Sequence, residues 1–190
     1  NGRGLEKAKS AGIDTHLGVC AAAAKAVLSG FLTRIERGRP YVWMKTAASL
    51  DGGIALADGE KRWLTGRPMR HFVHEVRSRC DALLTGVGTI LADDPELTCR
   101  APARNADSPA VFVLDSQLRT PPTARIFGAG SRPVMLLCTS SAPKDRLMAL
   151  TQAGAVVTRL PAHPNGQLDL DAVLDHLGAG GINTLLVEAG

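Results

Sequence analysis

Residues 45–100 read KTAASLDGGIALADGEKRWLTGRPMRHFVHEVRSRCDALLTGVGTILADDPELTCR and contain the densest set of structural signals in the chain. In the second half of this stretch, an apolar run at residues 82–85 leads into Gly86-Val87-Gly88 and a short helical pattern that ends at Asp94-Pro95. A strand that opens into glycines and continues as a helix is a typical place to hold a phosphate. Polar side chains at the ends of such elements are where ligands usually bind in α/β sheets.

An amphipathic helix is predicted upstream of that strand, beginning near Thr65, a plausible N-cap, with Pro68 tolerated in its first turn. Apolar residues follow at helical spacing: Met69, Phe72, Val73 and Val76. On a helical wheel Arg77 lies at the shoulder of this apolar face. It is therefore either an arginine that snorkels or forms a local ion pair, or one half of a phosphate clamp shared with Arg100.

Strands and helices alternate on the carboxyl side of this stretch. Further strands are predicted at residues 110–114, 134–138, 155–160 and 182–187, with helices at residues 89–92, 143–153 and 169–177. On the amino side, we expect a short strand at residues 13–19, a helix at residues 21–37 and a strand at residues 41–47. The alternation from residue 81 onward favours a largely parallel α/β sheet flanked by helices.

Composition limits the classes of protein that fit. A length of 190 residues suits one domain, or one domain and a fragment of another, and the 4% aromatic content means that the core is aliphatic. The net charge of +4 fits either an anion-binding site or a solvated surface. No basic run is interleaved with aromatic residues, so nucleic-acid binding has little support, and no apolar run is long enough for a membrane span.

A metal site is not expected from the cysteines or histidines. The four cysteines form no C-x-x-C pair: Cys20, Cys80, Cys99 and Cys138. Cys80 and Cys138 lie in apolar segments, which indicates reduced core thiols and a cytosolic setting. His71 and His74 are three residues apart, without a third ligand, and are expected to be solvated on the polar helix face.

Single residues at strand ends are candidates for chemistry, each with a plainer alternative. Lys45 is either an outward-facing residue of a half-covered strand or a group that polarises a substrate atom. Asp115-Ser116 and Glu188 each follow a strand, and Thr85-Gly86 end another; these groups would meet in a crevice if the three strands are neighbours. Glu188 could equally be a cap or a solvated loop residue. The Gly86-x-Gly88 pattern is weak alone, because a tight turn explains it as well.

Five blocks in fixed order and spacing carry a family resemblance over residues 39–190. They are RPYVWMKTAASLDG, DGEKRWLTG, VRSRCDALLTGVGTILADDPELTCR, VLDSQLRTP and LLVEAG. Together they resemble the reductase domain of the bifunctional riboflavin-biosynthesis deaminase/reductase. Residues 1–39 resemble the C-terminal tail of the deaminase domain, its last strand and helix, and residues 40–190 the N-terminal two-thirds of the reductase domain. The zinc-binding H-A-E and P-C segments are absent, so zinc would belong only to the missing deaminase domain.

The resemblance implies a dihydrofolate-reductase-like fold that is C-terminally incomplete. It implies NADPH-dependent reduction of 5-amino-6-(5-phosphoribosylamino)uracil to the ribitylamino product, with the pyrimidine deamination belonging to the full-length protein. It further implies a cytoplasmic homodimer that binds a phosphorylated small molecule and neither nucleic acid nor membrane.

The resemblance also assigns residues to the site. Lys45 and Glu188 would be catalytic and flank the ribose carbon, with no metal ligands. The cofactor contacts would be Ala47, Trp63, Gly86, Thr89, Asp93, Ser116 and Gly190. The substrate contacts would be Lys61, Arg77, Leu97, Arg100 and Glu188, although Lys61 stands where the family often has a small polar residue.

Both ends of the chain look cut, and the family's glycine-rich cofactor loop continues past Gly190. We therefore expect the strand at residues 182–187 to lack neighbours and the chain alone to form no competent reductase site. Two other functions fit the residues: reduction of another pterin or pyrimidine, and a non-catalytic or truncated nucleotide-binding module that pairs with a partner at an open sheet edge.

Overall fold

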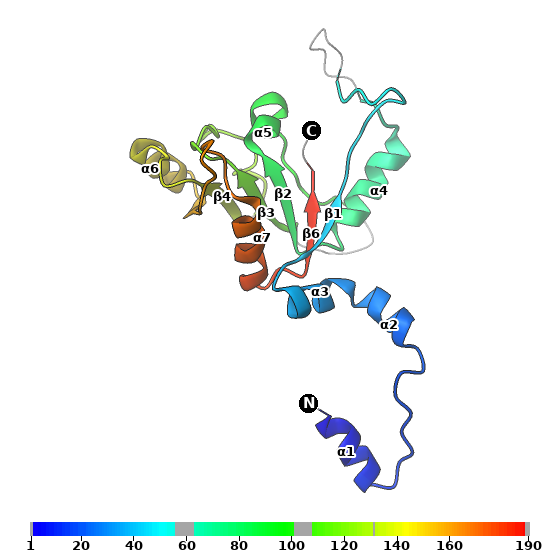
Figure 1. Cartoon of the computed structure of the whole chain (residues 1–190). Coiled ribbons are helices and arrows are strands. Elements are labelled where there is room, and N and C mark those ends of the chain that lie inside the picture. Colours follow the sequence, from blue (N-terminus) through cyan, green and yellow to red (C-terminus); the bar gives the residue numbers. More distant parts are fainter. Residues whose placement is uncertain (1, 56–62, 101–107, 131, 189–190) are drawn as a thin grey trace.

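A parallel six-stranded sheet forms the centre of the computed structural model, which describes residues 2–55, 63–100, 108–130 and 132–188 (Figure 1). The strands are β1 (Tyr41–Met44), β2 (Ala82–Gly86), β3 (Ala110–Leu114), β4 (Val134–Cys138), β5 (Val156–Arg159) and β6 (Thr184–Val187). They lie in the order β1-β6-β2-β3-β4-β5, and each neighbouring pair is parallel. The predicted α/β class with a parallel sheet is confirmed. Lys61 and Gly190 lie outside the described residues.

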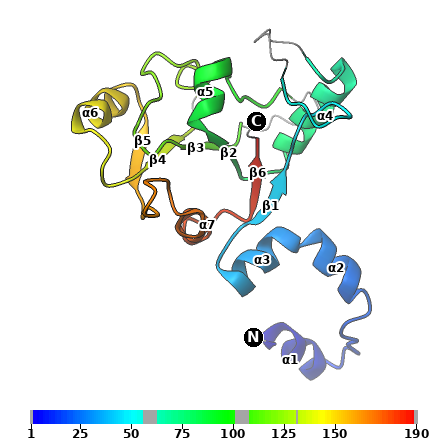
Figure 2. The same ribbon diagram turned by 45° about the horizontal axis from the view of Figure 1, so that its top comes forward.

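Helices cover both faces of the sheet (Figure 2). The helices α4 (Arg67–Arg77), α5 (Val87–Asp93) and α6 (Lys144–Gln152) lie on one face, and α7 (Leu170–Ala179) lies on the other. Successive strand residues face opposite sides, so Leu83 and Val111 pack under the first group while Leu84 and Phe112 pack under α7. None of the helices in the described part of the chain could cross a membrane.

The predicted helix beginning near Thr65 is present, but Gly66 rather than Thr65 is its N-cap, and no side chain caps it. Pro68 lies in its first turn, as expected. The predicted apolar stripe does face the sheet in part, since Val76 packs against the core, while Met69 and Phe72 remain half exposed.

Residues 2–40 lie beyond the end of the sheet where the strands begin (Figures 1 and 2). They form α1 (Arg3–Ser10), α2 (Ala21–Val27) and α3 (Ser29–Arg37). Only α3 is anchored tightly: a Cβ on Gly30 would lie 2.5 Å from Thr184 Oγ1, and Arg34 Nε donates to Asn183 Oδ1 at 2.7 Å. This close packing keeps α3 away from the opposite, carboxyl edge of the sheet.

Two predictions for this region are wrong. Residues 13–19 form no strand, because no strand lies beside them to supply hydrogen bonds, and Ile13, Leu17 and Val19 stay exposed. The single helix predicted for residues 21–37 is interrupted at Leu28, whose ψ of 14° departs from helical geometry. The apolar stripe that predicted one helix continues across this break, so the pattern could not reveal it.

The strand β6 has neighbours on both sides, which contradicts the expectation that it would have none. After α7 the chain returns and inserts between β1 and β2, so that Leu185 is opposite both Val42 and Ala82. The Asp81 carboxylate fixes the start of β6 by accepting the N–H groups of Asn183 and Thr184, at 2.8 and 2.9 Å. Glu188 is therefore placed in the interior of the carboxyl edge.

Candidate functional site

Four predicted site segments lie along the carboxyl edge of the sheet. Lys45 follows β1, Glu188 follows β6, α5 begins directly after β2 and Ser116 lies two residues beyond β3. Because these strands are consecutive neighbours in the sheet, the segments lie side by side. The condition that the sequence left open, that these strands be neighbours, is met.

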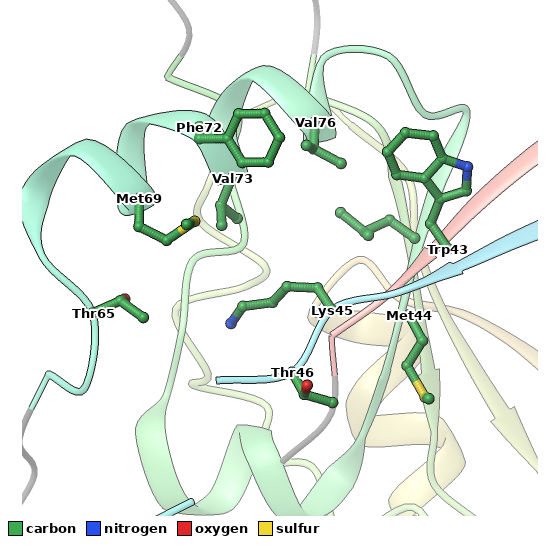
Figure 3. A pocket seen from close by; sticks show the side chains of 10 residues that line it. Trp43, Met44, Lys45, Thr46, Thr65, Met69, Phe72, Val73 and Val76 are labelled. Atoms are coloured by element: carbon green, nitrogen blue, oxygen red, sulfur yellow. The ribbon is translucent and has the colours of Figure 1, made fainter. Parts of the chain in front are cut away.

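The Lys45 side chain extends into a cavity of about 320 Å³ between β1 and α4 (Figure 3). Its main-chain N–H donates to Val187 O at 3.0 Å, which ties the end of β1 to β6. The walls are mostly apolar: Trp43, Met44, Thr46, Thr65, Met69, Phe72, Val73, Val76 and Leu186. A cavity with apolar walls and one ammonium group can orient a small molecule by a single polar atom. The Lys45 side chain thus lies on the side of β1 that faces α4.

A buried ion pair joins α4 to the end of β6. Arg77 Nε lies 2.6 Å from Glu188 Oε1, and Arg77 Nη2 lies 2.8 Å from Glu188 Oε2, a two-pronged contact. The side chains are only 12% and 9% exposed, so Glu188 is neither a cap nor a solvated loop residue. Arg77 Nη1 also donates to Thr98 O at 2.8 Å. Of the five guanidinium N–H groups, two remain for a ligand within the described part of the chain.

The segment of residues 96–100 runs beside this pair. Leu97 is buried in the core with φ of 51°, so a substrate could reach only its main chain. Arg132 donates to the carbonyls of Glu96 and Leu97, and burial lowers the pKa of Arg132 to about 10, which leaves it charged at neutral pH. Arg100 is exposed, and its main-chain N–H donates to His74 Nδ1 at 3.2 Å.

Open space surrounds the turn between β2 and α5. The helix begins at Val87, two residues before the predicted start, with Gly86 as an N-cap that makes no side-chain hydrogen bond. A Cβ at Gly86 or Gly88 would meet no atom within 4 Å. The Thr85 hydroxyl, buried just before the turn, has no partner among the described residues. The turn thus offers a bare main chain, whereas the Thr85 hydroxyl is enclosed by protein atoms.

The remaining predicted cofactor contacts are spread along the same edge. Ala47 lies three residues beyond β1, Asp93 ends α5, and Thr89 lies within that helix. Trp63 is 79% exposed, and the Arg70 guanidinium lies 4.5 Å from the centre of its ring. Hydrogen bonds join the end of β1 to β6 and the last turn of α4 to the end of β6, so the segments that carry Lys45, Glu188 and Arg77 lie together. Trp63 lies elsewhere, next to Arg70 on α4.

Asp115 proves to be structural rather than part of a crevice. Its fully buried carboxylate accepts the N–H groups of Arg119 and Thr120, at 2.8 and 2.7 Å, and the Thr120 hydroxyl at 2.8 Å. Ser116 remains at the edge, and its carbonyl accepts both the N–H and the hydroxyl of Thr139. A strand-end position predicted the location of Asp115 but not this use of its oxygens.

The cysteines are free, as expected, and no cluster of metal-ligating side chains occurs among the described residues. Cys138 is buried and Cys80 half-buried; burial raises the pKa of the Cys138 thiol, and that of Cys80 to about 11. Both thiols therefore stay protonated at neutral pH.

The expectation of two solvated histidines is half wrong. His71 is exposed, but His74 is half-buried and accepts the Arg100 N–H. Burial, followed by the charges of Arg77 and Arg100, lowers the pKa of His74. His74 and Arg132 were both missed as site-related residues. His74 lies on the predicted helix and Arg132 in an irregular stretch before β4, and their partners lie in a segment that carries no periodic signal.

Comparisons with known proteins converge on one family. The RibD C-terminal domain family matches residues 40–190. The riboflavin biosynthesis protein RibD of Escherichia coli is 36% identical over 206 aligned residues, covering all of this chain and 53% of that protein. The RibD of Aquifex aeolicus is 31% identical and covers all of this chain, which spans 51% of it. The chain thus spans about half the length of these curated relatives.

Solved structures agree with the sequence matches. Acinetobacter baumannii RibD has a TM-score of 0.81 and 32% identity, covering all of this chain and 51% of that protein. The diaminohydroxyphosphoribosylaminopyrimidine deaminase/5-amino-6-(5-phosphoribosylamino)uracil reductase of Thermotoga maritima has a TM-score of 0.80 and 28% identity, covering all of this chain and 50% of its own. The expected dihydrofolate-reductase-like fold is confirmed.

Proposed function

Because this chain belongs to the RibD C-terminal domain family, we propose that its carboxyl-edge site serves the NADPH-dependent reduction of 5-amino-6-(5-phosphoribosylamino)uracil to the ribitylamino product. One arrangement carries the proposal. The Lys45 side chain lines an apolar cavity at the end of β1, and the buried Arg77–Glu188 ion pair lies at the end of the neighbouring strand, β6. The Thermotoga maritima relative is described as a 5-amino-6-(5-phosphoribosylamino)uracil reductase, which supports the same substrate. For full-length proteins of this family, we also propose deamination of the pyrimidine precursor.

The β2–α5 turn fits a dinucleotide. The open space at Gly86 and Gly88 leaves room for a pyrophosphate beside the main-chain N–H groups at the start of α5. NADPH, when bound, supplies the hydride. The residues proposed to hold it are Ala47, Trp63, Gly86, Thr89, Asp93, Ser116 and Gly190.

The phosphorylated sugar is proposed to bind on the surface formed by the last turn of α4 and the adjoining Arg100. Arg100 and the two unused N–H groups of Arg77 would donate to phosphate oxygens. Lys61 and the main chain of Leu97 would complete the contacts. Glu188 holds the Arg77 guanidinium in one orientation, which reduces the entropy lost when the phosphate binds.

Lys45 and Glu188 are proposed to flank the ribose carbon. The Lys45 ammonium can donate a hydrogen bond to the sugar oxygen or to the linking nitrogen, and so stabilise an open-chain, imine-like form or supply its proton. The mostly apolar walls of the cavity leave the Lys45 ammonium as the one charged group among its described lining residues, which can orient the polar atom of a bound substrate.

A reductase of another pterin or pyrimidine is the second candidate. It gains support from the ion pair of Arg77 with Glu188, because an arginine already hydrogen-bonded has fewer donors for a phosphate.

Family membership also leads us to propose a homodimer that acts in the cytoplasm and binds no nucleic acid.

Two measurements test this function. Fluorescence titration of the chain with NADPH measures cofactor binding. NADPH oxidation is then measured in a hybrid in which this chain replaces the matching segment of Escherichia coli RibD, with the phosphoribosylaminouracil as substrate. A hybrid that binds NADPH but does not oxidise it would contradict the proposed substrate.

Lys45→Met in this hybrid should abolish turnover while NADPH still binds, because the variant keeps the volume of the side chain and loses the proton donor. Lys25→Met on α2, which is exposed and remote from the cavity, is the matched control and should keep full turnover. Full activity of the Lys45 variant would refute the catalytic role.

A further inference from the structure

The last turn of α4 holds three consecutive residues of the segment 98–100. Arg77 donates to Thr98 O at 2.8 Å, Cys99 Sγ donates to His74 O at 3.2 Å, and Arg100 N–H donates to His74 Nδ1 at 3.2 Å. The last of these contacts depends on a side chain that no proposed step uses. It connects His74 directly to the main chain of an arginine proposed to bind phosphate.

An Nδ1 atom that accepts a hydrogen bond belongs to a neutral imidazole with its proton on Nε2. The charged groups that face His74 are Arg77 on its own helix, Arg100 on the adjoining segment and Glu188 at the end of β6. Glu75 is its chain neighbour but pairs with the exposed His71 at 3.5 Å. Burial and the two arginines lower the pKa of His74, so the acceptor form dominates at neutral pH.

We propose that His74 is a positioning residue for the phosphate site, whose Nδ1 fixes the Arg100 main chain and thereby the direction from which the Arg100 guanidinium reaches a bound sugar phosphate. This inference rests on the proposed function. The Arg100 side chain is exposed, and a long exposed side chain loses conformational freedom when it binds a ligand. Anchoring its main chain beforehand removes the main-chain part of the ordering cost and leaves only the side-chain part.

Two variants separate the acceptor from the bulk of the ring. His74→Asn places Oδ1 near the position of Nδ1 and retains an acceptor, whereas His74→Leu has a similar volume and none. His71→Leu, three residues earlier on the same helix and exposed, is the matched control. Ribose 5-phosphate is the probe, and its dissociation constant is measured by calorimetry at neutral pH. The Arg100 amide signal is followed by NMR spectroscopy of the same proteins.

His74→Leu should weaken ribose 5-phosphate binding by roughly tenfold, the effect of losing one hydrogen bond in the binding site. His74→Asn should restore most of that affinity, and His71→Leu should leave it unchanged. The Arg100 amide proton should move to lower frequency in the leucine variant, as its hydrogen bond is lost, and should stay near its original position in the asparagine variant.

Equal affinity of the unsubstituted and His74→Leu chains would overturn the proposal. An Arg100 amide proton with the same chemical shift in the unsubstituted chain and in both His74 variants would also overturn it. Failure of every variant, and of the unsubstituted chain, to bind ribose 5-phosphate would instead contradict the proposed function. In that case the Arg100 signal would still report the His74 contact, so that the two failures are distinguishable.

Discussion

Three side chains, Lys45, Arg77 and Glu188, define the site at the scale of single residues. Each comes from a different element, and each was recognisable in the sequence as a polar group at the end of an apolar segment. The sequence could not reveal that Arg77 and Glu188 are partners, because the residues that separate them in the chain carry no pairing signal. It also left out His74, whose role depends on a loop packed across its helix.

Glu188→Gln should destabilise the chain by about 3 kcal/mol, because the buried Arg77 guanidinium would lose its counter-charge. Urea unfolding followed by circular dichroism measures the change. Glu36→Gln on α3, where the carboxylate is exposed, should change the free energy of unfolding by less than about 0.5 kcal/mol. If both substitutions had the same small effect, the ion pair would not be buried in solution.

At the scale of elements, α4 and the β2–α5 turn do most to shape the site. The helical spacing predicted α4, and the glycines predicted the turn, since each follows from local sequence. The start of α5 and the interruption between α2 and α3 were missed, because element ends depend on tertiary contacts as well as on local preference.

Gly88→Ala tests the turn. The added Cβ meets no protein atom, and alanine favours a helix over glycine by up to about 1 kcal/mol, so thermal stability should be unchanged or raised. NADPH affinity should nevertheless fall by roughly tenfold, because the methyl group would occupy space proposed for the phosphates. Unchanged affinity in the fluorescence titration would place the cofactor elsewhere.

The free energy of unfolding of the chain should depend on pH through His74 on α4. Its pKa is lowered in the folded chain, so the unfolded chain binds a proton more readily as the pH falls through the ordinary histidine range, near 6.5. The contribution of neutral His74 is therefore complete above that value and is lost progressively below it, by less than about 1.4 kcal/mol per pH unit. His74→Asn should flatten this part of the profile relative to His71→Asn. Identical profiles in urea unfolding between pH 5 and 8 would refute the shift.

At the scale of the whole molecule, the central fact is the return of β6 into the middle of the sheet. The alternation of apolar runs and helical patterns predicted the parallel class, because such patterns are local. Strand order is not a local property. Thr184 pairs with Tyr41 and Leu185 with Ala82, and nothing in the sequence of residues 182–187 predicts these partners. The expectation that this strand would lack neighbours came from the resemblance alone, and it was wrong.

Leu185→Ala should cost about 3 kcal/mol, since the fully buried side chain lies in the core under α7. Val156→Ala on the edge strand β5, where the valine is 56% exposed, should cost less than about 1 kcal/mol. Guanidinium unfolding of the two variants provides the comparison. Similar losses at both positions would mean that β6 is not an interior strand.

The central claim is that one edge of this sheet binds a nicotinamide nucleotide beside a phosphorylated sugar. NMR titration of the hybrid with Escherichia coli RibD, isotope-labelled in the segment that this chain supplies, with NADPH and then ribose 5-phosphate tests it most directly. We predict that NADPH shifts the amide signals of Gly86, Thr89 and Ser116, and that ribose 5-phosphate shifts those of Arg77, Arg100 and Glu188. Shifts confined to α1–α3 at the opposite end of the sheet, or no shifts at all, would contradict the account.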